Sequence, residues 1–367
     1  MIALLIVSLI VSVMAFAGCG QGAGAPEGGD PPQVVEPEQT PEPEPVPEPD
    51  GAGEDGTPQV GGPQPTDTAP AVYFTEDISP AGLVAVYEAL VASTSGASPN
   101  GASPHGIPPH GKIAVKISTG EPPNSNYLRP ELIKDLVQML GGTIVESNTA
   151  YGGSRASNAK HFQVAEDHGF TAIAPFDLLD ENGSVSLPVT GGEILTENIV
   201  GANFVNYDYY VILSHFKGHG MAGFGGAIKN ASIGIASAEG KSWIHTGGKK
   251  TSGFSGDQDS FLMAMAESAK SVEDYLGGNI LYINVMNRLS VDCDCNGNPA
   301  EPDMHDIGIL ASFDSVALDR ACVDLVVAAP DGASLVERIN SRNGTLTLDH
   351  AAKIGLGFLD YTLISID

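Results

Sequence analysis

The run Tyr209-Tyr210-Val211-Ile212-Leu213 decides the fold, and the glycine-rich segment that follows it, residues 214–230, decides where we expect the site. A continuous apolar run of this length predicts a buried strand of a parallel sheet. The segment after it holds two histidines, two lysines and several glycines, and residues 227–236 predict a helix. Ligands of open α/β sheets bind beyond the carboxyl ends of strands, where glycine lets them approach the backbone. The functional site is therefore expected in residues 214–230.

Strand and helix patterns alternate on both sides of this stretch. A strand at 112–118, a helix at 131–140 that Gly141 and Gly142 end, and a strand at 143–146 form a βαβ unit, which requires parallel strands. Further strands are predicted at 171–174, 186–190, 280–285, 307–312 and 361–366. Further helices are predicted at 74–90, 158–168, 257–276, 316–329, 331–340 and 349–354. The pattern predicts a three-layer α/β fold, with a mostly parallel sheet flanked by helices.

The first 72 residues differ from the rest in composition. Residues 1–18 are almost wholly apolar and lead to Cys19, a pattern typical of a lipoprotein signal peptide whose cysteine is lipidated after cleavage. Residues 19–72 are rich in Pro, Glu and Gly, which predicts a disordered acidic tether, because proline removes backbone donors and like charges repel. Residues 73–367 form the predicted α/β domain. We expect an extracytoplasmic protein on the cell membrane, held there only by its acyl (palmitate) anchor.

The charge of the chain narrows the range of partners. The formal net charge is −28, and no Lys or Arg precedes Lys112. The remainder of the chain carries all 17 basic residues and still has an excess of acidic ones. Neutralising nucleic-acid phosphates requires a basic face, so we expect no nucleic-acid partner.

Three basic residues of the central segment stand two positions apart. His215, Lys217 and His219 share one face if the chain is extended, and the two histidines share one face of a helix. This spacing suits metal ligands or a base beside a cationic anchor; the alternative is a solvated loop. His245 lies in a second glycine-rich stretch, where it could add a ligand or cover the site. His215 and His245 are the candidate proton carriers of a catalytic site.

The glycine pair before the predicted helix resembles an anion cradle. Gly225 and Gly226 precede helix residues 227–236, whose free N–H groups and dipole would favour a phosphate or carboxylate. Lys229 would add a positive charge. The alternative is that the glycines only allow close packing of the helix.

The third motif is Cys293-Asp294-Cys295. Two thiolates on one loop lie within reach of a single ion, and zinc or iron suits such ligands. We place Cys293, Cys295 and His219 in one metal site. A disulfide between residues two apart would be strained, so Cys322 is the more plausible disulfide partner for either cysteine, and inert thiols are the third alternative. Cys322 falls within a predicted helix, where cysteine usually acts as a small buried hydrophobe.

Five segments together resemble a family known as domain of unknown function 362, sometimes labelled iron–sulfur centre proteins. They are residues 112–118, Lys217-x-His219, 226–230, 293–295 and 306–319, and the resemblance spans about 111–366. The resemblance places these residues on family motif positions: Lys116, Lys217, His219, Lys229, Asn230, Cys293 and Cys295. Many members carry an additional ferredoxin-like cysteine cluster, which this chain lacks. A divalent zinc or iron ion is therefore expected in preference to an iron–sulfur cluster.

These observations lead to one hypothesis and one alternative. The hypothesis is a lipid-anchored extracytoplasmic protein with a metal or redox site beside an anion-binding glycine-rich loop. The alternative is a non-catalytic lipoprotein that binds an anionic small molecule. The residues expected to contact that molecule are Lys116, Lys217, Gly225, Gly226, Lys229 and Asn230.

Overall fold

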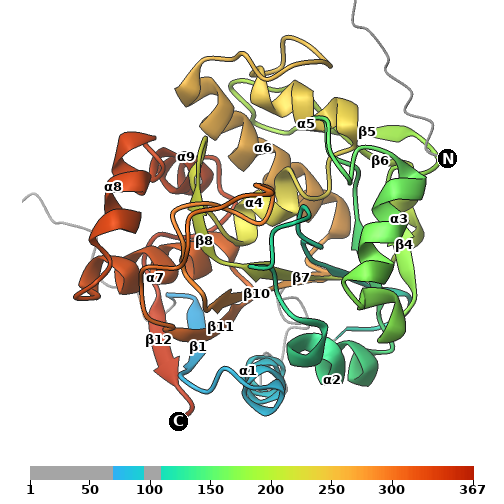
Figure 1. Cartoon of the computed structure of the whole chain (residues 1–367). Helices are drawn as coiled ribbons and strands as arrows, with labels where there is room; N and C mark the ends of the chain where they lie inside the picture. The colour runs from blue at the N-terminus through green and yellow to red at the C-terminus, as the bar shows by residue number, and fades with distance from the viewer. Residues whose placement is uncertain (1–68, 95–108) are drawn as a thin grey trace, which may run out of the picture. The chain divides into compact units, whose positions relative to one another are not determined.

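The computed structural model describes residues 69–94 and 109–367 (Figure 1). The predicted signal peptide, Cys19 and the tether as far as residue 68 lie outside the described residues. The domain begins earlier than expected, because β1 (Ala71–Thr75) belongs to the main sheet. The helix predicted at 74–90 is α1 (Pro80–Ala92), since Ser79 caps it by accepting the Gly82 N–H and proline favours the first helical position.

Eight strands of the described chain form one sheet, in the order β12-β1-β11-β10-β7-β2-β3-β4. Their bounds are β2 (Ile113–Lys116), β3 (Thr143–Glu146), β4 (Phe176–Leu178), β7 (Tyr209–His215), β10 (Ile280–Met286), β11 (Gly308–Ser312) and β12 (Thr362–Ser365), with β1 as above. Strands β10, β7, β2, β3 and β4 are parallel neighbours, whereas β11 runs antiparallel to β1 and β10. The predicted α/β fold with a mostly parallel sheet is confirmed.

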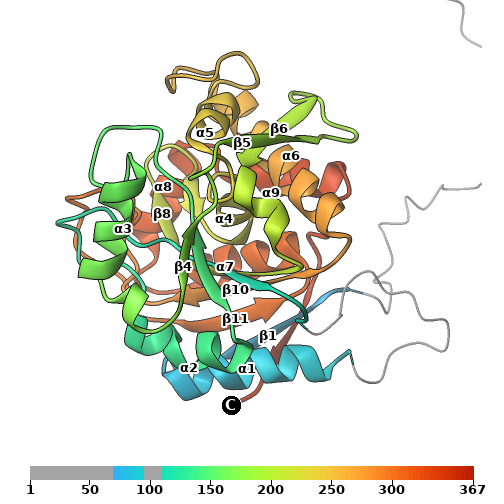
Figure 2. The ribbon, with the colours of Figure 1, turned by 90° about the vertical axis from the view of Figure 1, so that its right-hand side faces the viewer.

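Helices cover both faces of this sheet (Figures 1 and 2). Helices α1 and α2 lie against one face, and α4, α6 and α7 lie on the other. The helices after α1 are α2 (Pro130–Leu140), α3 (Asn158–Asp167), α4 (Ala227–Ser232), α5 (Ala238–His245), α6 (Gln258–Leu276), α7 (Ser315–Ala328), α8 (Ala333–Ser341) and α9 (Leu346–Lys353). Among the described residues, no helix combines the length and apolarity needed to cross a bilayer.

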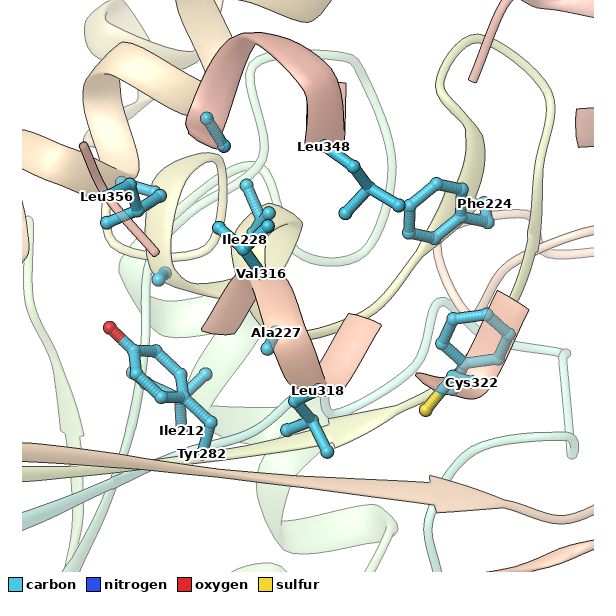
Figure 3. Close-up of a cluster of buried hydrophobic side chains, with 14 of the residues drawn as sticks. Ile212, Phe224, Ala227, Ile228, Tyr282, Val316, Leu318, Cys322, Leu348 and Leu356 are labelled. Carbon is cyan, nitrogen blue, oxygen red and sulfur yellow. The ribbon is translucent and has the colours of Figure 1, made fainter. Parts of the chain in front are cut away.

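The central strand β7 is buried along its whole length, as its apolar run predicts. Its side chains alternate between the faces: Val211 packs in the cluster beneath α1 and α2, and Ile212 packs in the cluster beneath α4 and α7. Figure 3 shows the second cluster, in which Ile212 and Tyr282 rise from the sheet toward Ile228. Helices cover both faces of β7, and β10 and β2 flank its two edges. Only the ends of the strand are therefore open to a site.

Some predicted elements were wrong. The strand predicted at 171–174 is instead a 3-10 helix (Phe170–Ala172), and β4 begins only after Pro175. The helix predicted at 227–236 ends at Ser232, and a separate helix, α5, follows it. Two short antiparallel pairs lie outside the main sheet: β5 (Ser184–Pro188) with β6 (Glu197–Gly201), and β8 (Lys217–His219) with β9 (Gly223–Gly225).

A buried acid in α6 gives the fold a testable pH dependence. Burial raises the pKa of Glu273 to about 8 from its ordinary 4.5, even though Tyr282 donates a hydrogen bond to its carboxylate. As pH rises between these values the unfolded chain loses this proton and the folded chain keeps it, so the wild-type free energy of unfolding falls. A Glu273→Gln variant has no such proton to lose, so its free energy of unfolding should not fall in this way. By pH 9 the variant should be more stable than the wild type by on the order of a few kcal/mol, relative to the difference at pH 5. Urea unfolding at pH 5 and pH 9 measures this; a difference independent of pH would contradict it.

Candidate functional site

A single cavity of about 530 Å³ gathers all of the residues predicted for the site. It lies at the carboxyl edge of the sheet, where Lys116 ends β2, Glu146 ends β3 and His215 ends β7. The predicted residues that line it are Lys116, His215, Lys217, His219, Gly225, Gly226, Lys229, Asn230, His245, Cys293 and Cys295. His215, Lys217 and His219 reach it from a nearly continuous extended segment, which fits the shared face expected of that spacing.

Other residues that line the cavity were missed by sequence reasoning. The charged ones are Glu146, Arg155, Lys241, Asp292 and Asp294. The position of Glu146 at the end of a predicted strand was a usable signal, and Asp294 stands between the two cysteines. No local pattern marks Arg155 or Lys241.

Lys116 is held by protein groups. Its ammonium donates to the Ile117 carbonyl (2.5 Å), Glu146 (3.2 Å) and the Asn230 side-chain oxygen (3.0 Å). Burial lowers the Lys116 pKa, and Glu146 opposes that shift. Burial alone would raise the Glu146 pKa, but Lys116, His161 and Arg155 lower it overall. The Lys116–Glu146 pair is therefore part of the frame of the cavity.

Asn230, like Lys116, is bonded to protein groups around the cavity. Its amide nitrogen donates to the carbonyls of Lys116 and Leu213 and to the Ser214 hydroxyl, while its oxygen accepts from Lys116. These bonds tie α4 to β2 and β7. The structure thus gives both Lys116 and Asn230, predicted as ligand contacts, a full set of protein partners.

Lys217 and His215, two further residues predicted for the site, both contact Asp294. Lys217 forms an ion pair with Asp294 and donates to the Asn126 carbonyl at 2.6 Å. His215 donates from Nε2 to the Asn287 carbonyl at 2.7 Å, and its Nδ1 lies 3.3 Å from the Asp294 carboxylate. Nε2 therefore carries the proton that it donates, Nδ1 faces the Asp294 carboxylate, and the role of His215 as a proton carrier stays a prediction. Burial alone would raise the Asp294 pKa, but Lys217 and His215 lower it to about 2.

Lys229 is different from the other lysines of the cavity. Within residues 69–94 and 109–367, no hydrogen-bond or ion-pair partner is found for its ammonium. Burial, and then the charge of Lys116, lowers its pKa to about 8. Lys241 donates to the Ala236 carbonyl at 2.6 Å, and burial lowers its pKa to about 8 as well. Gly225 leaves room for Lys229, because a Cβ there would lie 3.0 Å from the Lys229 Cδ.

The predicted anion cradle at the start of α4 is already filled by the protein. The Asp319 carboxylate accepts the N–H groups of Ala227 (2.7 Å) and Ile228 (3.0 Å), so these donors are not free for a ligand. A Cβ at Gly226 would lie 2.2 Å from an Asp319 oxygen. Gly226 is therefore required for packing, which was the alternative interpretation, and the cradle hypothesis is wrong.

The two cysteines of the third motif form a disulfide with each other. Their Cα atoms lie 5.3 Å apart, within the range that a disulfide can bridge, so the expected preference for pairing with Cys322 is wrong. Cys322 is a free, buried thiol in α7, and burial raises its pKa. Cys293 is nearly buried, whereas Cys295 is partly exposed.

His219 lies beside this disulfide. One of its ring nitrogens and the two sulfurs all lie within 4.8 Å of one another, so the three residues could hold a metal ion. Metal binding requires reduced cysteines, because a disulfide offers no thiolate. It also requires a change at His219, whose Nδ1 accepts the backbone N–H groups of Met221 (3.2 Å) and Ala222 (2.9 Å). With Nδ1 as acceptor, the proton of the neutral ring is on Nε2, which makes Nε2 a hydrogen-bond donor.

His245 has the opposite arrangement. Its Nδ1 donates to the Lys241 carbonyl at 2.6 Å, and its ring stacks on Phe261. Burial lowers its pKa to about 4, so the ring is neutral near pH 7 and Nε2 has a free lone pair. His245 therefore keeps an accepting nitrogen at the cavity, and its role as a proton carrier stays a prediction.

The fold and this cavity define an α/β protein with a cavity that several charged residues line at the carboxyl edge of its sheet. The chain belongs to the family described as Domain of unknown function (DUF362), which matches residues 113–324. No curated protein matches the chain.

Two solved structures are similar to part of this chain. One is the lactate racemase apoprotein from Thermoanaerobacterium thermosaccharolyticum, with 14% identity, a TM-score of 0.34, and coverage of 59% of this chain and 50% of that one. The other is a protein from Thermotoga maritima, with 13% identity, a TM-score of 0.35, and coverage of 66% and 58%. Each alignment spans less than two thirds of the solved chain, and neither similarity extends to a function.

The Asp319 cap leads to a stability prediction. In an Asp319→Ala variant two buried N–H groups of α4 lose their acceptor, which should lower the free energy of unfolding by roughly 2–4 kcal/mol. Asp319→Asn should cost less, because its amide oxygen can still accept. Denaturant unfolding measures both, with Glu337→Ala, at an exposed acidic residue of α8, as the control. Wild-type stability in Asp319→Ala would show that the carboxylate does not cap α4.

Proposed function

We propose that the cavity binds a small anionic molecule and that Lys229 is its charge partner. The observation that carries this proposal is the ammonium of Lys229, which faces the cavity without a partner in the described chain. Lys116, Lys217 and Lys241 each donate to protein oxygens, so their charges are already stabilised. Lys229 is half-buried, and a partly desolvated cation without a partner is less stable than one paired with an anionic ligand.

The charge balance of the cavity supports the same proposal. Five cationic side chains line it, against three acidic ones. The whole chain has a net charge of −28, so a cationic cavity is not a consequence of its composition. A volume of about 530 Å³ is in the range of small-molecule sites. The ligand class is therefore a small carboxylate or phosphate.

We also propose that the protein is anchored by a lipid at Cys19 on the outer face of the membrane. The support is the apolar run of residues 1–18 and the acidic Pro-rich segment after it. Labelling with radioactive palmitate should mark the wild type and not a Cys19→Ser variant; equal labelling of the two would exclude this site.

Anion binding by Lys229 can be measured by titration calorimetry. The full chain should bind phosphate or succinate, and Lys229→Gln should weaken binding by roughly tenfold or more, because it removes the charge and keeps a polar side chain only one atom shorter. Affinity should fall as pH rises past about 8, where the Lys229 ammonium loses its proton.

The matched control is Lys134→Gln, a change at an exposed lysine of α2 far from the cavity residues. It should bind as the wild type does. Equal losses in both variants, or binding that Lys229→Gln leaves intact, would contradict the proposal.

A second candidate function is metal binding, which the distances among His219, Cys293 and Cys295 favour. Zinc or iron is the expected ion, and only the reduced protein should bind it. Full chain reduced with a phosphine should take up about one zinc per chain. The oxidised protein and a Cys293→Ser/Cys295→Ser variant should not. Equal zinc uptake by all three would exclude this cluster as the site.

A further inference from the structure

The Cys293–Cys295 disulfide forms part of the wall of the same cavity that Lys229 faces. Its two sulfurs differ in their surroundings. Cys295 is partly exposed, whereas Cys293 is nearly buried and its Sγ accepts the backbone N–H of Cys295 at 3.3 Å. An incoming thiolate therefore has better access to Cys295, and the sulfur that it would expel, Cys293, already has a hydrogen-bond donor.

His219 lies close to both sulfurs of the disulfide and can offer an N–H donor to a thiolate formed there. Its Nδ1 is occupied by two backbone N–H groups, so the proton of the neutral ring is on Nε2. A ring nitrogen and both sulfurs lie within 4.8 Å of one another. N–H donors stabilise a thiolate, and a stabilised thiolate is a better leaving group in thiol–disulfide exchange. A protonated Nε2 can donate a hydrogen bond to a thiolate, but it cannot coordinate a metal ion until it loses that proton. The tautomer of His219 therefore suits a dithiol better than a metal site.

We propose that Cys293 and Cys295 are a redox-active pair that exchanges with small anionic thiols, which Lys229 binds through their carboxylate or phosphate group. The inference rests on the proposed anion site and names the class of its ligand. The protein is acidic overall, and a cation without a partner in the cavity that the disulfide also lines should favour negatively charged thiols over neutral ones.

The exchange is balanced as a two-electron step. The thiolate of the small molecule attacks the Cys295 sulfur, the sulfur–sulfur bond breaks, and its electron pair leaves on Cys293. A second small thiolate attacks the small-molecule sulfur of the mixed disulfide and releases the Cys295 thiolate. The small thiol is oxidised to its disulfide, the protein pair is reduced to two thiols, and the protons of the two consumed thiols pass to the cysteines.

The test compares two thiols of similar size, mercaptoacetate and 2-mercaptoethanol, as reductants of the oxidised full chain. Peptide mapping follows the rate at which Cys293 and Cys295 become available for alkylation. This rate is divided by the rate at which the same thiol reduces a small-molecule disulfide, which corrects for the intrinsic reactivity of the thiol. Mercaptoacetate should be preferred by roughly tenfold or more. Lys229→Gln should bring the preference close to one, and Lys134→Gln should keep it.

His219 variants test the leaving-group argument. His219→Ala should slow reduction by both thiols roughly tenfold, the effect of one lost charge-assisted hydrogen bond. His219→Gln, which keeps an N–H donor, should recover most of that rate. Cys322 should stay unmodified throughout, because it is buried.

Two results would overturn the proposal. One is a disulfide that reacts with both thiols at equal normalised rates while calorimetry still shows phosphate binding through Lys229; the anion site would then stand without the thiol chemistry. The other is a native full chain in which Cys293 and Cys295 never form or break a disulfide in thiol buffers. Loss of phosphate binding itself would instead refute the anion site.

Discussion

The ion pair between Lys217 and Asp294 joins the two halves of the site. Lys217 follows the central strand β7, and Asp294 lies in the loop after β10, between the two cysteines. Both side chains are nearly fully buried, and a buried charge without a partner is strongly destabilising. The pair therefore holds the cysteine loop against the cavity, where His219, two residues beyond Lys217, meets the sulfurs.

The same requirement explains which cationic residues are structural and which one is free to bind. Lys116 is satisfied by Glu146 and a carbonyl, and the start of α4 is satisfied by Asp319. Lys229 projects from α4 into the cavity without such a partner in the described residues. Residue type alone does not separate these lysines. Their roles follow from whether the surrounding chain supplies an oxygen atom.

The sequence predicted the fold, and the residues that it proposed for the site line one cavity, because both follow from local patterns. The apolar run 209–213 indicates a buried parallel strand, and the carboxyl-edge rule then places Lys116, His215 and Cys293 near one another. Long-range partners could not be predicted. Asp319, which accepts the first N–H groups of α4, is 92 positions from Ala227 in the sequence. No residue near Gly226 indicates this partner. The pairing of Cys293 with Cys295 and the hydrogen-bonded nitrogen of His219 also depend on backbone geometry that only the fold determines.

Anomalous diffraction from crystals soaked in bromide tests the central claim, that one uncompensated ammonium makes this cavity an anion site, most directly. The account predicts a bromide ion in contact with the Lys229 Nζ inside the cavity, and no bromide at the Ala227 and Ile228 N–H groups, which Asp319 occupies. A cavity without bromide, or bromide bound at the start of α4 in place of Asp319, would contradict it.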